Sequence, residues 1–235
     1  MASNYPNGIS RNSQYNVDIV FCIDVTGSME KLIKLVQKNV SHFYKDVQSA
    51  AKRANKHIDV FRVRLIAFRD YLADNDDAMY SSEFFTLPDD NVKFQKCVNS
   101  LVALGGDDDQ EDGLEALAFA IRSKWNNSSK KKRHLIVLWT DDDAHDLGFG
   151  KESPAYPVGM AVNIRDLTAW WGDYDAPGFM DQDAKRLILF APAKPHWLQI
   201  SKGWNKVLHV ESQAGQGLSE FDYEQVIDAI LRTVT

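Results

Sequence analysis

The chain has few of the features that mark secreted, membrane-spanning or nucleic-acid-binding proteins. It contains two cysteines, Cys22 and Cys97, which lie far apart and suggest free thiols in a reducing compartment. No apolar run approaches the ~18 residues of a membrane-spanning helix, and the first residues lack the basic and apolar segments of a secretory signal. The formal net charge of −6 argues against a nucleic-acid partner. We therefore expect a cytoplasmic protein that binds neither a membrane nor nucleic acid.

Motifs for nucleotide and nucleic-acid chemistry are also weak. A glycine-rich phosphate-binding loop is absent, which argues against nucleotide hydrolysis. The basic run Lys130–Arg133 comes before an apolar strand pattern, so it should lie at the opposite end of the sheet from any residues that follow the strands. We interpret this run as a solvated loop.

What the sequence does contain is an alternation of strand and helix patterns. This alternation predicts one α/β domain over residues 16–235, after a polar N-terminal tail at 1–15. Strand patterns lie at 18–24, 58–68, 84–87, 134–140, 186–191 and 206–210, and helical patterns lie at 28–55, 91–104, 113–125, 165–171 and 222–234. Strands without clean alternation are typical of a sheet covered on both faces by helices. We expect a Rossmann-like, mostly parallel, six-stranded central sheet.

One strand is expected to run against the others. The stretch at 69–83 is acidic and has no helical pattern, whereas parallel strands are usually joined by a crossover helix. The strand at 84–87 should therefore pair antiparallel with the strand at 58–68, at an edge of the sheet.

A long aromatic-rich insert at 143–185 does not fit an economical α/β unit. Loops of this length are usually functional or carry their own structure. Trp170 and Trp171 have two interpretations, either as a small core of the insert or as a surface for a protein partner. Because the insert begins beside the residues that follow a central strand, we favour a lid or a partner surface.

Carboxylates and hydroxyls follow two of the predicted strands. Asp24, Thr26 and Ser28 come directly after the first strand, and Asp141 comes after the strand at 134–140. In open α/β sheets, ligands bind beyond the carboxyl ends of the strands. Oxygen ligands in such a place suit a hard cation such as Mg²⁺. The alternative is ordinary turn and helix-cap chemistry, but the occurrence of both groups at neighbouring strand ends favours a metal.

These motifs resemble the von Willebrand factor type A domain with a metal-ion-dependent adhesion site, in its intracellular and bacterial form. The family pattern is D-x-[ST]-x-S after the first strand, a Thr in a Gly-Gly loop, and an Asp after the fourth strand. Asp24, Thr26, Ser28 and Asp141 match this pattern, and Gly105–Asp112 is similar to the loop. Residues 68–71, Phe-Arg-Asp-Tyr, also resemble these relatives, and the resemblance covers roughly residues 17–235.

The resemblance implies both a ligand set and a kind of partner. Thr26 and Ser28 would bind Mg²⁺ through their hydroxyls, and Asp24 and Asp141 would bind it directly or through water. A protein partner would complete the metal shell with an acidic side chain. Relatives inside cells often work with ATPases, kinases or chaperone-like machines, so the resemblance implies a partner of that kind.

The loop departs from the family pattern at one position. Asp109 stands where the family has Thr, so it is a fifth candidate ligand or an acid held outside the metal shell. The extra negative charge makes Mn²⁺ or Ca²⁺ alternatives to Mg²⁺. Asp108 and Asp142 are candidate partner-binding residues beside the site. His145 could orient a ligand or act as a base, although a lone loop histidine usually does neither.

An enzymatic alternative rests on a second resemblance. Asp-Val-Thr-Gly-Ser at 24–28 is similar to the nucleophile loop of aspartate-phosphorylating hydrolases, in which Asp24 would be the nucleophile of a Mg²⁺-dependent phosphohydrolase or phosphotransferase. That class usually has an acid two residues after the nucleophile, where this chain has Thr26. It also inserts a flap after the motif, where this chain begins a helix. These differences favour a non-enzymatic interaction module.

Overall fold

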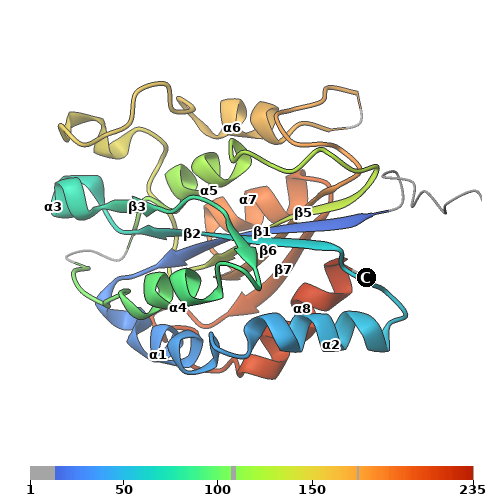
Figure 1. The fold of residues 1–235 in the computed structure, drawn as a ribbon. Coiled ribbons are helices and arrows are strands. Elements are labelled where there is room, and N and C mark those ends of the chain that lie inside the picture. Colours follow the sequence, from blue (N-terminus) through green and yellow to red (C-terminus); the bar gives the residue numbers. More distant parts are fainter. Residues whose placement is uncertain (1–13, 107–109, 174, 235) are drawn as a thin grey trace, which may run out of the picture.

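The computed structural model describes residues 14–106, 110–173 and 175–234, and this part of the chain forms a seven-stranded sheet between two layers of helices (Figure 1). The strands are β1 Tyr15–Asp24, β2 Val60–Phe68, β3 Met79–Ser81, β4 Phe85–Leu87, β5 Lys131–Trp139, β6 Lys185–Pro192 and β7 Val207–Ser212. The α-helices are α1 Glu30–Asn39, α2 Phe43–Arg53, α3 Tyr71–Asp74, α4 Asn91–Asn99, α5 Gly113–Ile121, α6 Ile164–Trp171, α7 Pro195–Gly203 and α8 Tyr223–Val234. Short 3₁₀ turns are η2 Gly27–Met29, η3 Asn75–Asp77 and η4 Phe149–Glu152.

The predicted α/β fold with a mostly parallel sheet is confirmed. The strand order is β3-β2-β1-β5-β6-β7, and β1 pairs in parallel with β2 on one side and β5 on the other. The register places Asp24 beside Phe68 and Ile23 beside Trp139. The carboxyl ends of β1, β2 and β5 therefore meet at one edge of the sheet. Lys131 pairs with Tyr15 at the opposite end of β1, as the sequence predicts for the basic run.

Two short strands, rather than one, cover the outer edge of β2. β4 pairs antiparallel with Phe61–Val63, which confirms the predicted edge strand. β3 also pairs antiparallel with β2, along Ile66–Phe68, and the sequence analysis missed it. Three residues are too few to show an alternating pattern, so pairing rather than local propensity defines this strand.

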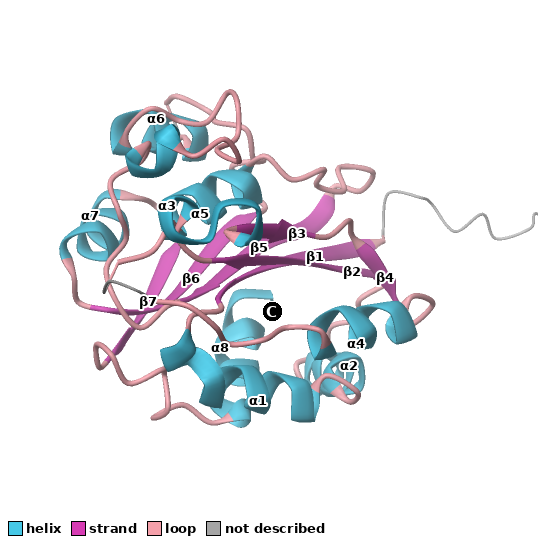
Figure 2. Ribbon diagram, turned by 90° about the vertical axis from the view of Figure 1, so that its left-hand side faces the viewer, coloured by secondary structure: helices cyan, strands magenta, loops and turns pink. Residues whose placement is uncertain are grey.

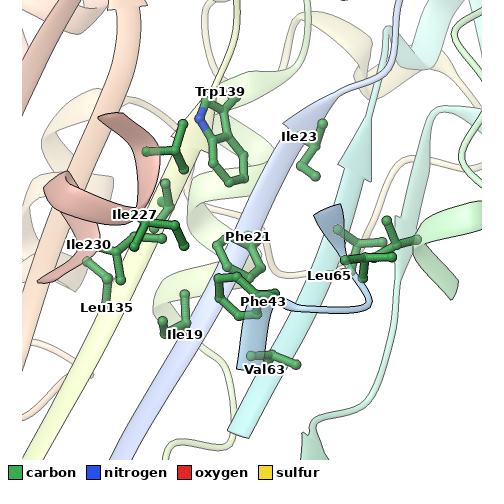
Figure 3. Close-up of a cluster of buried hydrophobic side chains, with 14 of the residues drawn as sticks. Ile19, Phe21, Ile23, Phe43, Val63, Leu65, Leu135, Trp139, Ile227 and Ile230 are labelled. Atoms are coloured by element: carbon green, nitrogen blue, oxygen red, sulfur yellow. The ribbon is translucent and has the colours of Figure 1, made fainter. Parts of the chain in front are cut away.

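The two faces of the sheet have separate hydrophobic cores. Helices α1, α2, α4 and α8 cover one face, and α5, α6 and α7 cover the other (Figure 2). Alternate residues of β1 point to opposite sides. Phe21 packs near Phe43 on the first face (Figure 3), whereas Cys22 lies in the second core. Burial of both sets explains why the strands show no clean alternation.

The predicted single helix at 28–55 is wrong in its continuity. The chain forms η2, then α1, a turn at 40–42, and α2. The side-chain amide of Asn39 donates to the Leu35 carbonyl at the end of α1, and Val40, Ser41 and His42 after it are weaker helix formers than most residues of α1. The break lets Phe43 enter the first core. Helix α7, which begins with Pro195 in its first turn, was also not predicted.

The 143–185 insert packs against the sheet domain. Its helix α6 lies beside α5, and Trp171 is fully buried in the second core. The Trp171 indole stacks on Trp204 at a centroid distance of 5.2 Å and donates from Nε1 to the Asn205 carbonyl. No helix in the described ranges is both long and apolar enough to cross a membrane.

Candidate functional site

The predicted oxygen-rich residues meet at the carboxyl edge of the sheet. Asp24 is the last residue of β1, and Thr26 and Ser28 follow in the turn that leads to α1. Asp141 lies two residues beyond β5. Neither η2 nor α1 has a side-chain cap hydrogen bond at its N-terminus, so the hydroxyls of Thr26 and Ser28 do not serve as helix caps there.

A continuous series of contacts joins the four side chains. The Thr26 hydroxyl donates to Asp24 Oδ1 over 2.6 Å, and Ser28 Oγ donates to Asp141 Oδ1 over 3.0 Å. The two hydroxyl oxygens are 3.4 Å apart. Carboxylate and hydroxyl oxygens from two strand ends are therefore gathered within hydrogen-bonding distance of one another, in the donor set that hard divalent cations prefer.

The two carboxylates are buried, whereas the mouth of the site is open. Asp24 is 1% and Asp141 is 3% exposed, but Gly27 and Ser28 lie at the surface. Burial raises the pKa of Asp24 to about 6, hydrogen bonds from Thr26 oppose this shift, and the nearby Asp141 carboxylate adds to it. Without a cation, burial and the neighbouring Asp141 therefore both disfavour the charged form of Asp24.

Two outer residues position the acids of this site. Thr140 Oγ1 donates to Asp24 Oδ2 over 3.0 Å, and the Gly217 amide donates to Asp141 Oδ2 over 2.7 Å. Gly217 has a φ of 57°, and a Cβ there would lie 2.0 Å from the Ser28 carbonyl oxygen, so only glycine fits. The loop after β7 thus reaches the site, a role that sequence analysis missed although Gly215 and Gly217 mark a tight turn.

The Gly-Gly loop begins beside the same residues. The Gly27 amide donates to the Gly105 carbonyl over 3.2 Å, and a Cβ at Gly106 would lie 3.5 Å from Thr26 Cβ. Asp108 and Asp109 lie outside the described residues, so the prediction that Asp109 is a ligand stays a prediction.

The remaining candidates lie in other surroundings. Asp142 contacts Lys194 over 3.2 Å, and its carbonyl accepts from the Trp197 indole. His145 is buried and stacks on Phe149, with Nδ1 3.5 Å from Asp112 Oδ1. Trp170 is half-buried, and Arg122 lies over its ring at 5.1 Å. The preference for Trp171 as a partner surface needs correction, because this side chain is 0% exposed and belongs to the core.

A second polar cluster was not predicted. Asp70, Asp112 and His145 are all buried, and one potential ligand atom from each lies within 4.8 Å of the others. Asp70 accepts from the Leu72 amide at the start of α3, and Asp112 Oδ2 accepts from the Tyr71 amide. The sequence analysis named His145 as a candidate by itself, and Asp70 within the Phe-Arg-Asp-Tyr stretch and Asp112 before a helix were further signals, but no pattern joined the three residues.

The fold and the site define an open α/β domain with an oxygen-lined site at the carboxyl edge of its sheet. Residues 18–151 match the family model described as von Willebrand factor A domain. This match covers more than half of the chain, which therefore belongs to the von Willebrand factor A family.

Similar proteins support the fold over most of the chain. The chain is 24% identical over 149 residues to the alpha-protein kinase vwkA of Dictyostelium discoideum, covering 63% of this chain and 22% of the kinase. The pilus adhesin SpaC of Lactobacillus rhamnosus GG aligns over 94% of this chain and 31% of its own, with a TM-score of 0.55 and 12% identity. Its open conformation gives a TM-score of 0.52. The structural likenesses show the fold alone, and the chain spans less than a third of the length of both proteins.

Proposed function

We propose that this chain is a protein–protein interaction module that binds a divalent cation at a metal-ion-dependent adhesion site. Asp24, Thr26, Ser28 and Asp141 are the proposed ligands, and Mg²⁺ is the proposed ion. The observation that carries the proposal is the continuous series of contacts from Asp24 through both hydroxyls to Asp141. Membership of the von Willebrand factor A family supports an interaction role.

The charge balance of the site supports an open position for a partner. Asp24 and Asp141 would balance the two positive charges of the cation, while exposed Ser28 marks the side from which an acidic side chain can approach. If Asp109 also binds the metal, a third carboxylate would oppose that approach. The affinity for an acidic partner would then depend on this one residue.

The comparison with vwkA supports a kinase as the kind of partner, ahead of an ATPase or a chaperone-like machine. A cytoplasmic setting is supported by Cys22 and Cys97, which are both free thiols. The activity of the longer kinase is not transferred to this chain, which matches a limited part of it.

Calorimetric titration of Mg²⁺, Mn²⁺ and Ca²⁺ into the chelator-treated chain tests the metal site. We expect wild type to bind Mg²⁺ and Asp24→Ala to lose it. Asp183→Ala is the matched control, because this fully exposed Asp precedes β6 at the opposite sheet edge. Absence of binding by wild type to all three ions would remove the basis of the proposal.

Two further measurements separate the proposed role from its alternatives. Asp109→Thr should strengthen Mg²⁺-dependent binding of an acidic peptide if the extra carboxylate opposes the partner. Incubation with acetyl phosphate and Mg²⁺ should leave Asp24 unmodified, since its two carboxylate oxygens are held by Thr26 and Thr140. A stable adduct on Asp24 would instead establish the phosphotransfer alternative.

A further inference from the structure

The cluster of Asp70, Asp112 and His145 has the composition of a second metal site. The three residues come from the start of α3, the residue before α5, and the segment after β5. Two carboxylates and one imidazole converge there, and each side chain is at least nine-tenths buried. This donor set differs from that of the first site, which contains only oxygen.

The spacing of the cluster is close to that of a coordination shell. His145 Nδ1 lies 3.5 Å from Asp112 Oδ1, and the three potential ligand atoms lie within 4.8 Å of one another. Ligands bound tetrahedrally at bond lengths of about 2.0–2.2 Å lie roughly 3.3–3.6 Å apart. Side-chain movements of about an ångström would therefore bring all three atoms within bonding distance of one ion.

An orphaned oxygen of Asp112 points to a missing positive charge. This residue is 0% exposed, and while Oδ2 accepts from the Tyr71 amide, Oδ1 accepts no hydrogen bond from any residue in the described ranges. Leaving a buried carboxylate oxygen without a hydrogen-bond donor is costly. A cation would satisfy this oxygen directly.

Aromatic and backbone packing surrounds the cluster. His145 stacks on Phe149 at a centroid distance of 4.0 Å, which fixes the plane of the imidazole. A Cβ at Gly150 would lie 2.6 Å from Tyr71 Cβ and 3.4 Å from Asp112 Oδ2, so this segment can approach only because it carries glycine. The η4 turn thus closes over the cluster.

The cluster is rich in buried acids. Asp70 and Asp112 each bring a carboxylate, and Glu115 in the first turn of α5 is 0% exposed. A divalent cation would bring two positive charges to these acids, and it would bind His145 through a neutral imidazole, as metal binding requires.

We propose that Asp70, Asp112 and His145 form a second, enclosed cation site for a divalent transition metal of the Zn²⁺, Mn²⁺ or Fe²⁺ class. An imidazole nitrogen selects such ions over Mg²⁺ and Ca²⁺, which prefer oxygen. The Gly105–Asp112 segment ends at this site and begins at the first one, because Gly105 contacts Gly27. The two ions would therefore anchor opposite ends of one loop.

Titration of Zn²⁺ and Co²⁺ into the full chain, with excess Mg²⁺ to occupy the first site, tests the proposal. We expect one equivalent of Zn²⁺ to bind, and Co²⁺ to give visible absorption bands of a site containing nitrogen. His145→Gln and Asp112→Asn should each weaken Zn²⁺ binding at least tenfold and leave Mg²⁺ binding in place. Asp24→Ala should retain the Co²⁺ bands while losing Mg²⁺.

Controls assign the ion to these residues. His196 is the matched histidine, since it pairs with Asp143 and Asp146 outside the cluster, and His196→Gln should bind Zn²⁺ as wild type does. Circular dichroism establishes that each variant is folded. Zn²⁺ binding by His145→Gln and by Asp112→Asn is each compared with wild type, so one variant that fails to fold leaves the other as a test. The proposal is overturned if folded wild type binds no Zn²⁺, or if Zn²⁺ binding is lost in Asp24→Ala or His196→Gln but retained in His145→Gln. In the first case the contact between His145 and Asp112 is part of the fold and not an ion site.

Discussion

Two polar clusters lie along the same edge of the sheet, and they differ in exposure and in chemistry. The first, at Asp24 and Asp141, contains only oxygen donors and opens to solvent at Ser28. The second, at Asp112 and His145, includes a nitrogen donor and is fully enclosed. An open site can accept a ligand from a partner, whereas an enclosed one can only hold its own. Substitutions in the first cluster should therefore mainly change ligand binding, and substitutions in the second should mainly change stability.

A buried carboxylic acid that is costly to ionise without a counter-charge belongs to the first cluster, and another lies beside the second. Burial raises the pKa of Asp24 to about 6 and that of Glu115 to about 7. In the first site, a cation from solvent can offset the free energy needed to ionise the acid. In the second, ionisation lowers the stability of the metal-free folded protein. Substitutions there should therefore mainly change the free energy of unfolding.

The largest expected effect comes from Asp112→Ala. This change leaves the buried Tyr71 amide without its acceptor and removes the charge opposite His145. We expect the free energy of unfolding to fall by about 2–4 kcal/mol, with Mg²⁺ affinity in the folded protein little changed. Urea unfolding of the chelator-treated protein measures the first quantity, and calorimetry measures the second. A stable Asp112→Ala protein that fails to bind Mg²⁺ would reverse the assignment of the two clusters.

The opposite behaviour is expected for Asp24→Asn. The substitution keeps the shape of the side chain and removes a charge that costs free energy in the metal-free protein. Mg²⁺ affinity should fall at least ~30-fold, about 2 kcal/mol, while stability without metal is unchanged or higher. Calorimetry and urea unfolding on the same preparation make the comparison. A large loss of stability with unchanged Mg²⁺ binding would make Asp24 a purely structural residue.

Parallel topology explains why the first cluster was predictable. Asp24 and Asp141 each follow a strand, and neighbouring parallel strands bring their carboxyl ends together whatever the details of packing. Convergence of Asp70, Asp112 and His145 depends instead on a short helix, a helix start and a loop, and on the close approach of Gly150 to Tyr71. No periodicity in the sequence encodes such contacts.

Other differences have similar physical causes. The helix pattern at 28–55 carries the correct apolar spacing, but spacing alone does not reveal the turn at 40–42 that redirects α2. Trp171 belongs to the core because α6 packs on α5, a contact between segments far apart in the chain. The prediction for Asp109 falls outside the described residues and stays a prediction.

A pH dependence of Mg²⁺ binding should distinguish the open site. With the pKa of Asp24 at about 6, protons compete with the metal below that pH, and affinity should fall about tenfold between pH 7 and pH 5. Asp24→Asn should remove this dependence along with most of the affinity. Calorimetry at several pH values measures it, and an affinity independent of pH over this range would show that Asp24 does not bind the ion in its charged form.

The smallest expected effect concerns Glu115, whose folded-state pKa is raised from 4.5 to about 7. Stability linked to its proton is fully present below about pH 4.5 and is lost as pH rises through 7. Glu115→Gln cannot ionise, and its Oε1 can still accept from the Gly148 amide and the Tyr156 hydroxyl, as Glu115 Oε1 does. The variant should therefore be more stable than wild type at pH 8, by on the order of 1 kcal/mol.

At pH 5 most of this advantage should be gone, because Glu115 is then protonated in the folded wild-type protein. Urea unfolding of both metal-free proteins from pH 5 to 8 gives the two curves. Zn²⁺ should narrow the gap at pH 8 if a cation in the enclosed cluster offsets the charge of Glu115, which lies beside Asp112. Parallel curves without metal would show that Glu115 stays ionised throughout, and the enclosed cluster would then already hold enough positive charge without an ion.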